Sequence, residues 1–255
     1  MRSRHSTAPI YGGGSWMSLA TIQTGVRVKN QQTYDQLTRV ADRYPHLTRY
    51  FATQGYQTVA VQPGNTRRPG LRSFDPYQRD VLIEAPDLGY TGREFGWGKI
   101  PDQYSLGYAA EAIADIEAPV FFFFVGVTTH APWDEVPPVL ENWRALNNEA
   151  LTPTHASGYL ETIRYEWSAL ERFIESTADD ESVYIVLGDH QPALRRRERA
   201  ATYDAPVHVL SRDADFIAYF DDYGFEPGLV IESSEAPSDL RHEGLYSLII
   251  SSLRP

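Results

Sequence analysis

The sequence predicts an α/β fold in which a mostly parallel central sheet carries helices on both faces. Two apolar runs, Val120–Phe124 and Val183–Leu187, have no polar break. Short runs of β-branched and aromatic residues without polar alternation are typical of strands buried on both faces. Between them, the apolar residues of one segment fall on a single helical stripe: Leu160, Ile163, Trp167, Leu170, Phe173 and Ile174. Strands that alternate with amphipathic helices predict a layered α/β sheet.

The other elements are expected between the Gly and Pro residues that interrupt regular structure. A helix is expected from Ser15 to Thr24 because this stretch contains neither Gly nor Pro, and Gly25 ends it. Further helices are expected over residues 33–43, 47–54 and 104–116, and further strands over residues 58–62 and 205–210. The stretches 63–97 and 134–154 are expected to be mainly irregular, because turn-forming residues recur in them.

Composition limits the class of protein. The chain has 255 residues, enough for one large α/β domain, and we expect residues 1–255 to form a single domain. A net charge of −11 argues against a general nucleic-acid binder. The chain has no cysteine, so it needs no disulfide framework, and this leaves the compartment open. No apolar stretch reaches the ~18 residues of a transmembrane helix, and residues 1–10 lack the apolar segment of a signal peptide.

A Gly-Asp-His-Gln-Pro segment, Gly188–Pro192, directly follows the strand expected over residues 183–187. Ligands of open α/β sheets bind at the carboxyl ends of the strands. A carboxylate beside an imidazole at such an end suits a divalent metal with mixed oxygen and nitrogen ligands. Asp189 and His190 are therefore candidate metal ligands. The alternative is that Asp189 caps a turn and His190 is an ordinary loop residue.

A Gly-rich turn precedes Ser15, and a second His follows a strand. Gly12–Gly14 lets the backbone approach a ligand closely, and Ser15 then stands at a helix N-terminus, where free N–H groups favour an anion. This is a suitable place for an attacking hydroxyl, although a plain serine N-cap explains the pattern equally simply. His130 follows the run Val120–Phe124 in the same way that His190 follows its own strand.

These three segments together resemble the alkaline phosphatase/sulfatase superfamily, and within it they most resemble the lipoteichoic-acid-synthase-like phosphoglycerol transferases. That family has a Gly-rich turn ending in a Thr or Ser nucleophile, a His-x-Pro after a strand, and a Gly-Asp-His-x-Pro. Ser15, His130–Pro132 and Gly188–Pro192 match these features. The family's aromatic-x-Arg segment has a weaker match at Tyr77 and Arg79. The resemblance extends from about residue 8 to about residue 230 and implies an alkaline-phosphatase-like three-layer αβα sandwich.

The resemblance also implies roles for the matching residues. Ser15 is the expected catalytic nucleophile and, with Asp189 and His190, a ligand of one divalent ion, Mn²⁺, Mg²⁺ or Zn²⁺. His130 is expected to contact the phosphate or to protonate the leaving alkoxide. Tyr77 and Arg79 are expected to contact the substrate headgroup.

Two departures from the family pattern are visible. The family's first metal ligand is an acidic residue at the end of a strand upstream of the nucleophile, but residues 1–14 contain no Asp or Glu and no apolar run. We therefore expect the first strand to be missing and the domain to be incomplete at its N-terminus. In addition, the Cys/Ser-x-Pro-x-Arg signature of formylglycine sulfatases is absent, because Ser15 is followed by Trp16–Leu19.

The sequence thus predicts a metal-dependent phosphotransferase or phosphodiesterase that acts on phosphoglycerol-type or related phosphoesters through a Ser nucleophile. Two alternatives stay open: a sulfatase-family hydrolase of a sulfate ester, and an inactive remnant of the fold that acts as a binding module. The expected partners are a phosphoester or a lipid or polymer headgroup, without nucleic acid. By resemblance, the longer natural form lies outside the cytoplasmic membrane, anchored by a segment that this chain lacks.

Overall fold

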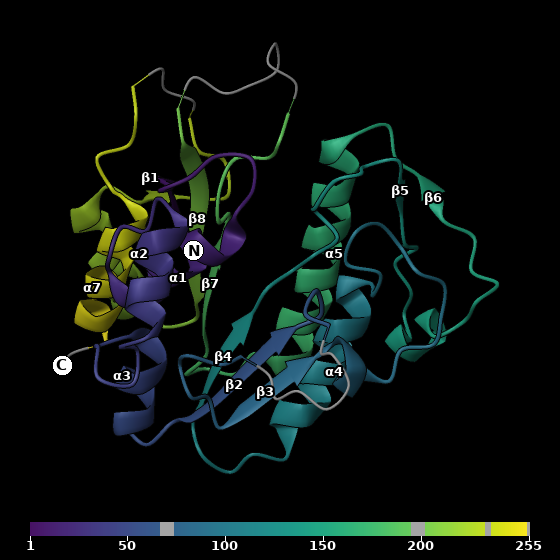
Figure 1. The fold of residues 1–255 in the computed structure, drawn as a ribbon, viewed down its shortest axis with the longest axis horizontal. Coiled ribbons are helices and arrows are strands. Elements are labelled where there is room, and N and C mark those ends of the chain that lie inside the picture. Colours follow the sequence, from purple (N-terminus) through teal and green to yellow (C-terminus); the bar gives the residue numbers. More distant parts are fainter. Residues whose placement is uncertain (67–73, 195–201, 233–235, 254–255) are drawn as a thin grey trace. The chain divides into compact units, whose positions relative to one another are not determined.

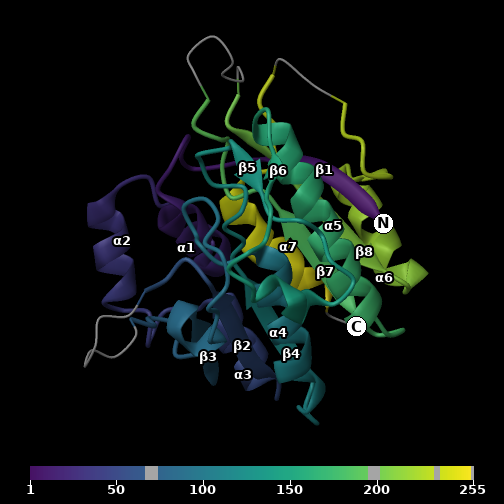
Figure 2. The same ribbon diagram turned by 90° about the vertical axis from the view of Figure 1, so that its right-hand side faces the viewer.

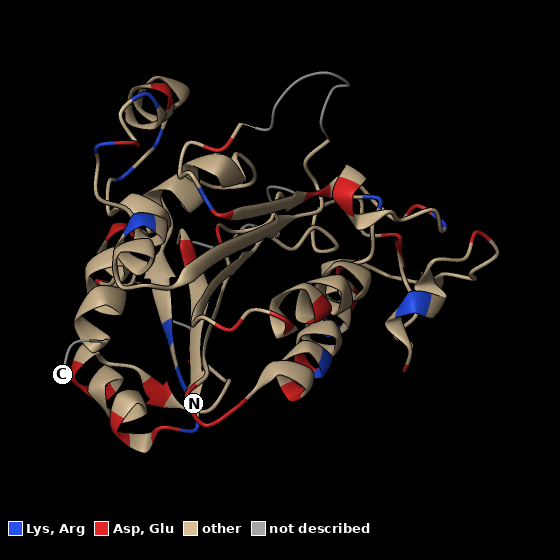
Figure 3. Cartoon of the chain, turned by 90° about the horizontal axis from the view of Figure 1, so that it is seen from below, with Lys and Arg blue, Asp and Glu red and all other residues tan. Residues whose placement is uncertain are grey.

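The computed structural model describes residues 1–66, 74–194, 202–232 and 236–253 of the chain. It divides into two compact units (Figure 1). The first unit combines the two ends of the chain, Met1–Tyr50 and Ala178–Pro255, and the second is the intervening stretch Phe51–Thr177. Acidic residues lie on helices and loops of both units (Figure 3), in keeping with the negative net charge.

The first unit is built on a four-stranded antiparallel sheet with the order β7-β8-β1-β9. Its strands are β1 (Arg2–Thr7), β7 (Val183–Leu187), β8 (Asp204–Ser211) and β9 (Glu226–Pro227). Its helices are α1 (Ser15–Thr24), α2 (Gln31–Thr38), α6 (Ala214–Ala218), the 3₁₀ helix η3 (Tyr219–Tyr223) and α7 (His242–Ser252). Helix α3 (Leu47–Thr53) joins this unit to the next one along the chain. Helix α1 packs against α7, and α6 packs against β8.

Strand β1 corrects the expectation that the chain lacks a strand before Ser15. Arg2–Thr7 pairs along its whole length with β8 and at its start with β9. The strand escapes a search for apolar runs because its buried positions are serines. Ser3 Oγ lies 2.7 Å from His208 Nδ1, and Ser6 Oγ lies 2.9 Å from His242 Nδ1. Backbone pairing and these buried hydrogen bonds therefore stabilise a strand that hydrophobicity does not mark.

The second unit contains the parallel pairing that the sequence predicts. Its main sheet has the order β3-β2-β4, and both neighbouring pairs are parallel. Its strands are β2 (Gln57–Gln62), β3 (Val81–Glu84), β4 (Val120–Phe124) and the short antiparallel pair β5 (Glu135–Val136) and β6 (Thr154–His155). Its helices are η1 (Ala85–Leu88), α4 (Asp102–Ala114), η2 (Trp143–Leu146) and α5 (Tyr159–Thr177). Helix α4 lies beside α5 (Figure 2) and also contacts β2.

Several predicted elements differ from the observed ones in detail. Strand β3 falls in the stretch that the sequence analysis treats as irregular. It has only four residues, and within the part of the chain that the structure describes it pairs with β2 alone. The two apolar runs, β4 and β7, are half-buried rather than fully buried, and Val183 is exposed. Both strands form an edge of their own sheet among the described residues, which leaves one side without a neighbouring strand.

Each unit has an apolar core of its own. In the first unit, Val207 and Val209 of β8 lie within it together with Phe220 and Leu245. In the second unit, β2 and α4 provide fully buried side chains: Val59, Ala60, Val61, Leu106 and Ala109. No helix among the described residues has the length and apolarity that crossing a membrane requires.

Candidate active site

Ser15 is the first residue of α1, directly after a turn of three glycines with positive φ. The φ angles of Gly12, Gly13 and Gly14 are 71°, 142° and 84°, values that L side chains rarely adopt. Gly14 occupies the N-cap position in a left-handed conformation, and no side chain caps the helix. Ser15 is therefore not a serine N-cap. Its hydroxyl is instead turned to another loop, where Ser15 Oγ lies 3.1 Å from His190 Nε2.

The ring of His190 is fixed by two hydrogen bonds on its two nitrogens. Nδ1 lies 2.8 Å from the backbone carbonyl oxygen of Gln191, an acceptor, so Nδ1 carries the proton of the neutral ring. Nε2 then presents its lone pair, and the Ser15 hydroxyl donates to it. Histidines that bind metals commonly have this arrangement, with one nitrogen on a carbonyl and the other turned to the ligand site.

Asp189 brings a carboxylate to the same nitrogen. Asp189 Oδ1 accepts the His190 backbone N–H at 2.9 Å, and Oδ2 lies 3.4 Å from His190 Nε2. Ser15 Oγ and Asp189 Oδ2 are both within 3.4 Å of the same atom, His190 Nε2, and therefore lie close to each other. A hydroxyl, a carboxylate and an imidazole nitrogen gather at one point, although Ser15 and His190 are 175 positions apart in the sequence.

Backbone contacts hold the two loops in this arrangement. The Gly12 N–H donates to the carbonyl of Gln191 at 3.0 Å, which ties the glycine turn to the Gly-Asp-His-Gln-Pro segment. On the other side, His242 Nε2 donates to the carbonyl of Gly188 at 3.1 Å, while His242 Nδ1 accepts from Ser6. His242 is fully buried, and burial lowers its pKa, so the ring is neutral at pH 7.

The sequence analysis did not find His242. It stands at the start of α7, far along the chain from both motifs, and no ligand-like spacing connects it to them. Its only sequence signal is the apolar stretch that follows it, which predicts a packed helix. His242 supports the site through hydrogen bonds to Ser6 on β1 and to the Gly188 carbonyl after β7. These three residues are distant in sequence and meet only in the folded chain.

The donor atoms at this point fit one divalent ion of the kind that mixed oxygen and nitrogen ligands prefer. Among the described residues, however, no group of three or more His, Asp or Glu side chains is placed to hold a metal. The groups that could bind such an ion at this point are the carboxylate of Asp189, Nε2 of His190 and the hydroxyl of Ser15.

His130 belongs to the second unit. Its ring stacks on Trp97 with the centroids 4.5 Å apart, and its Nδ1 lies 2.7 Å from the carbonyl oxygen of Ala131. By the same reasoning as for His190, Nδ1 carries the proton of the neutral ring and Nε2 remains available. The side chain of His130 is exposed, as is that of Trp97.

Tyr77 and Arg79 also belong to the second unit, where they contact each other. The Arg79 guanidinium lies over the Tyr77 ring, 5.0 Å from its centroid, and 2.6 Å from Asp75 Oδ1. The Arg79 side chain is only 4% exposed. Its charge is thus compensated by a neighbouring carboxylate. That the two residues contact a headgroup stays a prediction.

No family model matches the chain. Among curated proteins, the lipoteichoic acid synthase-like YvgJ of Bacillus subtilis (strain 168) is 25% identical over 122 residues, which are 46% of this chain and 19% of that protein. The matched stretch therefore covers about a fifth of the length of that curated relative.

Three solved structures resemble the chain in fold. A protein of the alkaline phosphatase superfamily from Vibrio parahaemolyticus has a TM-score of 0.55 at 16% identity, covering 83% of this chain and 52% of that one. Lipoteichoic acid synthase LtaP from Listeria monocytogenes has a TM-score of 0.56 at 16% identity, covering 82% and 57%. Phosphoglycerol transferase GacH of Streptococcus pyogenes, in complex with sn-glycerol-1-phosphate, has a TM-score of 0.57 at 13% identity. The match covers 86% of this chain and 64% of that one. These likenesses confirm the α/β sandwich of alkaline phosphatase type as the fold.

Proposed function

For a chain that resembles the alkaline phosphatase superfamily and its lipoteichoic-acid-synthase-like members in sequence and fold, we propose a phosphotransferase or phosphodiesterase of phosphoglycerol type. Ser15 is its nucleophile. One observation carries this proposal. Ser15 follows three glycines at the N-terminus of α1, and its hydroxyl lies 3.1 Å from His190 Nε2.

The reaction proceeds in two displacements. Ser15 Oγ loses its proton to solvent and attacks the phosphorus of the donor, so that an Oγ–P bond forms and the bond to the leaving alkoxide breaks. The N–H groups of the first turn of α1 face the phosphoryl oxygens, where the helix dipole favours negative charge. The hydroxyl oxygen of water or of an acceptor then attacks the phosphoserine, so that a new O–P bond forms and the P–Oγ bond breaks. The attacking hydroxyl loses its proton to solvent, and the Ser15 alkoxide takes one up, which regenerates the enzyme.

Asp189, His190 and Ser15 are the residues that hold a divalent ion in this proposal, with Mn²⁺, Mg²⁺ and Zn²⁺ as candidates. The ion would lower the pKa of the Ser15 hydroxyl and would neutralise negative charge on the phosphoryl oxygens. The hydrogen bond from His190 Nδ1 to the Gln191 carbonyl orients Nε2 for this role.

The residues of the second unit complete the proposal. His130 contacts the phosphate, or in its imidazolium form gives the Nε2 proton to the leaving alkoxide. Tyr77 and Arg79 contact the headgroup, with Asp75 holding the guanidinium. These roles require both units to act as one catalytic domain, which is the organisation that we propose for residues 1–255. Extracytoplasmic action in an anchored longer form is likewise proposed from the resemblance.

The test is cleavage of bis-(nitrophenyl) phosphate by the purified chain with each metal added in turn. Activity is expected to disappear with a chelator and in Ser15→Ala and Asp189→Asn. Ser157→Ala, which removes an exposed hydroxyl that donates to Glu161 in the second unit, is the matched control and should retain activity. Cleavage of an aryl sulfate without cleavage of the diester would favour the sulfatase alternative. Inactivity toward both, with metal bound, would favour the inactive remnant.

A further inference from the structure

A buried pair of carboxyl groups lies behind the loop that carries His130. Asp102 is the first residue of α4 and is fully buried. Its Oδ2 accepts two backbone hydrogen bonds, from the Val127 N–H at 2.8 Å and from the Thr128 N–H at 2.6 Å. The Asp102 N–H in turn donates to Thr128 Oγ1 at 3.3 Å. The start of α4 is thus bonded to the backbone that leads into His130.

Glu166 of α5 is the second member of the pair, and its carboxyl group lies close enough to that of Asp102 for each to affect the other's pKa. Both carboxyl groups approach the loop at Gly126, where a Cβ atom would lie 3.0 Å from Glu166 Oε1 and 3.3 Å from Asp102 Oδ2. A side chain at position 126 would therefore push the pair away from the loop.

A hydrogen bond between two carboxyl groups needs a proton on one of them. Asp102 Oδ1 and Glu166 Oε2 are buried, and no N–H or O–H group of a described residue donates to either of them, so a proton on one carboxyl group would satisfy both oxygens. Burial raises the pKa of Asp102 too, but the N–H groups of Val127 and Thr128 oppose this shift and favour its anion. Burial, and then the charge of Asp102, raise the pKa of Glu166 well above its usual range, so Glu166 is the member that holds the proton.

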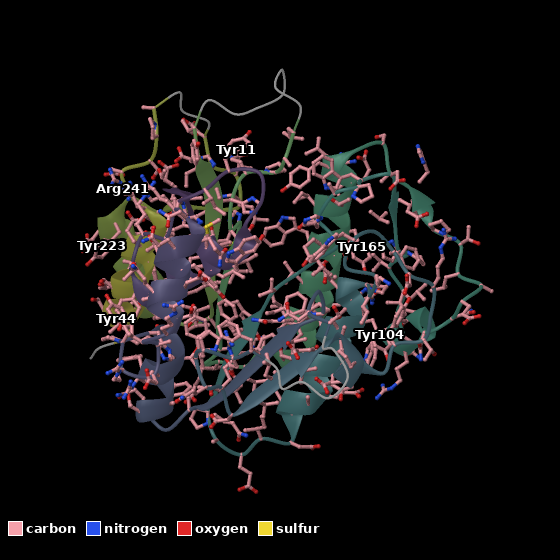
Figure 4. All side chains as sticks on the ribbon, viewed as in Figure 1. Tyr11, Tyr44, Tyr104, Tyr165, Tyr223 and Arg241 are labelled. Carbon is pink, nitrogen blue, oxygen red and sulfur yellow. The ribbon has the colours of Figure 1, made fainter. Side chains whose placement is uncertain are left out.

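The segment just before α4 also contacts His130, at the end of the loop that begins at Gly126. Trp97, five residues before Asp102, stacks on the His130 ring with the centroids 4.5 Å apart. Tyr165, the neighbour of Glu166 on α5 (Figure 4), accepts the Gln103 N–H through its hydroxyl at 3.2 Å, which fixes α4 against α5. Asp102 therefore holds the backbone at Val127 and Thr128, the His130 N–H donates to the Val127 carbonyl at 3.0 Å, and the His130 ring stacks on Trp97.

We infer that Asp102 is a positioning residue for His130, and that a protonated Glu166 holds the Asp102 carboxylate against the Val127 and Thr128 amides. This rests on the proposed function only for the role of His130 in the reaction. The contact chain itself lies within the second unit and does not depend on that role.

The experiment compares Asp102→Asn, Glu166→Gln and Glu166→Ala by amide hydrogen exchange and by NMR of the His130 ring. Gln has the shape of a protonated Glu and a donor N–H, so Glu166→Gln should keep Val127 and Thr128 protected and the His130 signals unchanged. Glu166→Ala and Asp102→Asn should lose that protection and shift the His130 ring signals. Asp80→Asn is the matched control, because Asp80 also accepts a backbone N–H, that of Thr58 at 2.8 Å, in the same unit.

The outcomes separate the two proposals. Unchanged His130 signals in a folded Asp102→Asn overturn the inference, as does a Glu166→Gln that behaves like Glu166→Ala. If Asp102→Asn does not fold, the comparison of Glu166→Gln with Glu166→Ala still tests the inference. In the cleavage assay, kcat for Asp102→Asn should fall by about a hundredfold with KM little changed, as for a misplaced catalytic group. If His130→Ala retains full activity while the NMR result holds, the role of His130 in the proposed function fails and the inference stands.

Discussion

Replacing Ser6 by Ala tests how the polar strand β1 is held and how it supports the site. Ser6 is fully buried, and its hydroxyl donates to His242 Nδ1 at 2.9 Å. Ser6→Ala removes the donor and leaves a buried ring nitrogen without a partner, since His242 Nε2 is bonded to the Gly188 carbonyl. An unsatisfied buried acceptor costs about 1–3 kcal/mol.

For a chain of this size, ~2 kcal/mol corresponds to a decrease in Tm of roughly 4–8 °C. The assay is urea and thermal unfolding followed by circular dichroism, with exposed Ser157→Ala as control, which should change stability by less than about 0.5 kcal/mol. A loss for Ser6→Ala no larger than that of the control would refute the reasoning. In that case the Ser–His contacts do not hold β1, and backbone pairing alone accounts for the strand.

Three further predictions concern single contacts. Gly98→Ala places a Cβ in steric conflict with the Val127 side chain and should destabilise the chain by about 1–3 kcal/mol in urea unfolding; an unchanged midpoint would contradict the close approach. Burial, with a smaller effect of His5, lowers the pKa of His208, so the unfolded state takes up a proton first and stability should fall as the pH drops below about 6.5. Urea midpoints at pH 7.5 and 5.5 check this, and His208→Asn should weaken the dependence. Asp75→Ala removes the carboxylate that lies 2.6 Å from the buried Arg79 guanidinium and that accepts the Tyr77 and Arg79 N–H groups, and it should cost about 1–3 kcal/mol, measured by thermal unfolding. A stable Asp75→Ala would mean that the guanidinium reaches solvent.

The motifs were predictable because local chemistry determines them. Three consecutive glycines before Ser15 predict a turn with positive φ, and all three adopt it. A Gly-Asp-His after an apolar strand predicts donor groups at the end of that strand, and Asp189 and His190 stand there beside Ser15. The fold class also follows from such local patterns, because uninterrupted apolar runs between amphipathic helices are specific to layered α/β proteins.

The supporting residues were not predictable, because their partners are distant in sequence. His242 bonds to Ser6 across 236 positions and to Gly188 across 54. Asp102 reads as an ordinary acidic residue in a first helical turn, and only the fold buries it under the loop before His130. Strand β1 was missed for a related reason: its buried side chains are hydroxyls whose partners come from β8 and α7.

The central claim is that the Ser15 oxygen becomes bonded to phosphorus during turnover. Quenching the chain in acid while it turns over a slow phosphodiester with Mn²⁺, followed by peptide mass spectrometry, measures this directly. The account predicts a phosphoester on the peptide that contains Ser15, absent when a chelator is present and absent in Ser15→Ala. Turnover by the wild-type chain without such an adduct, together with full activity of Ser15→Ala, would contradict it.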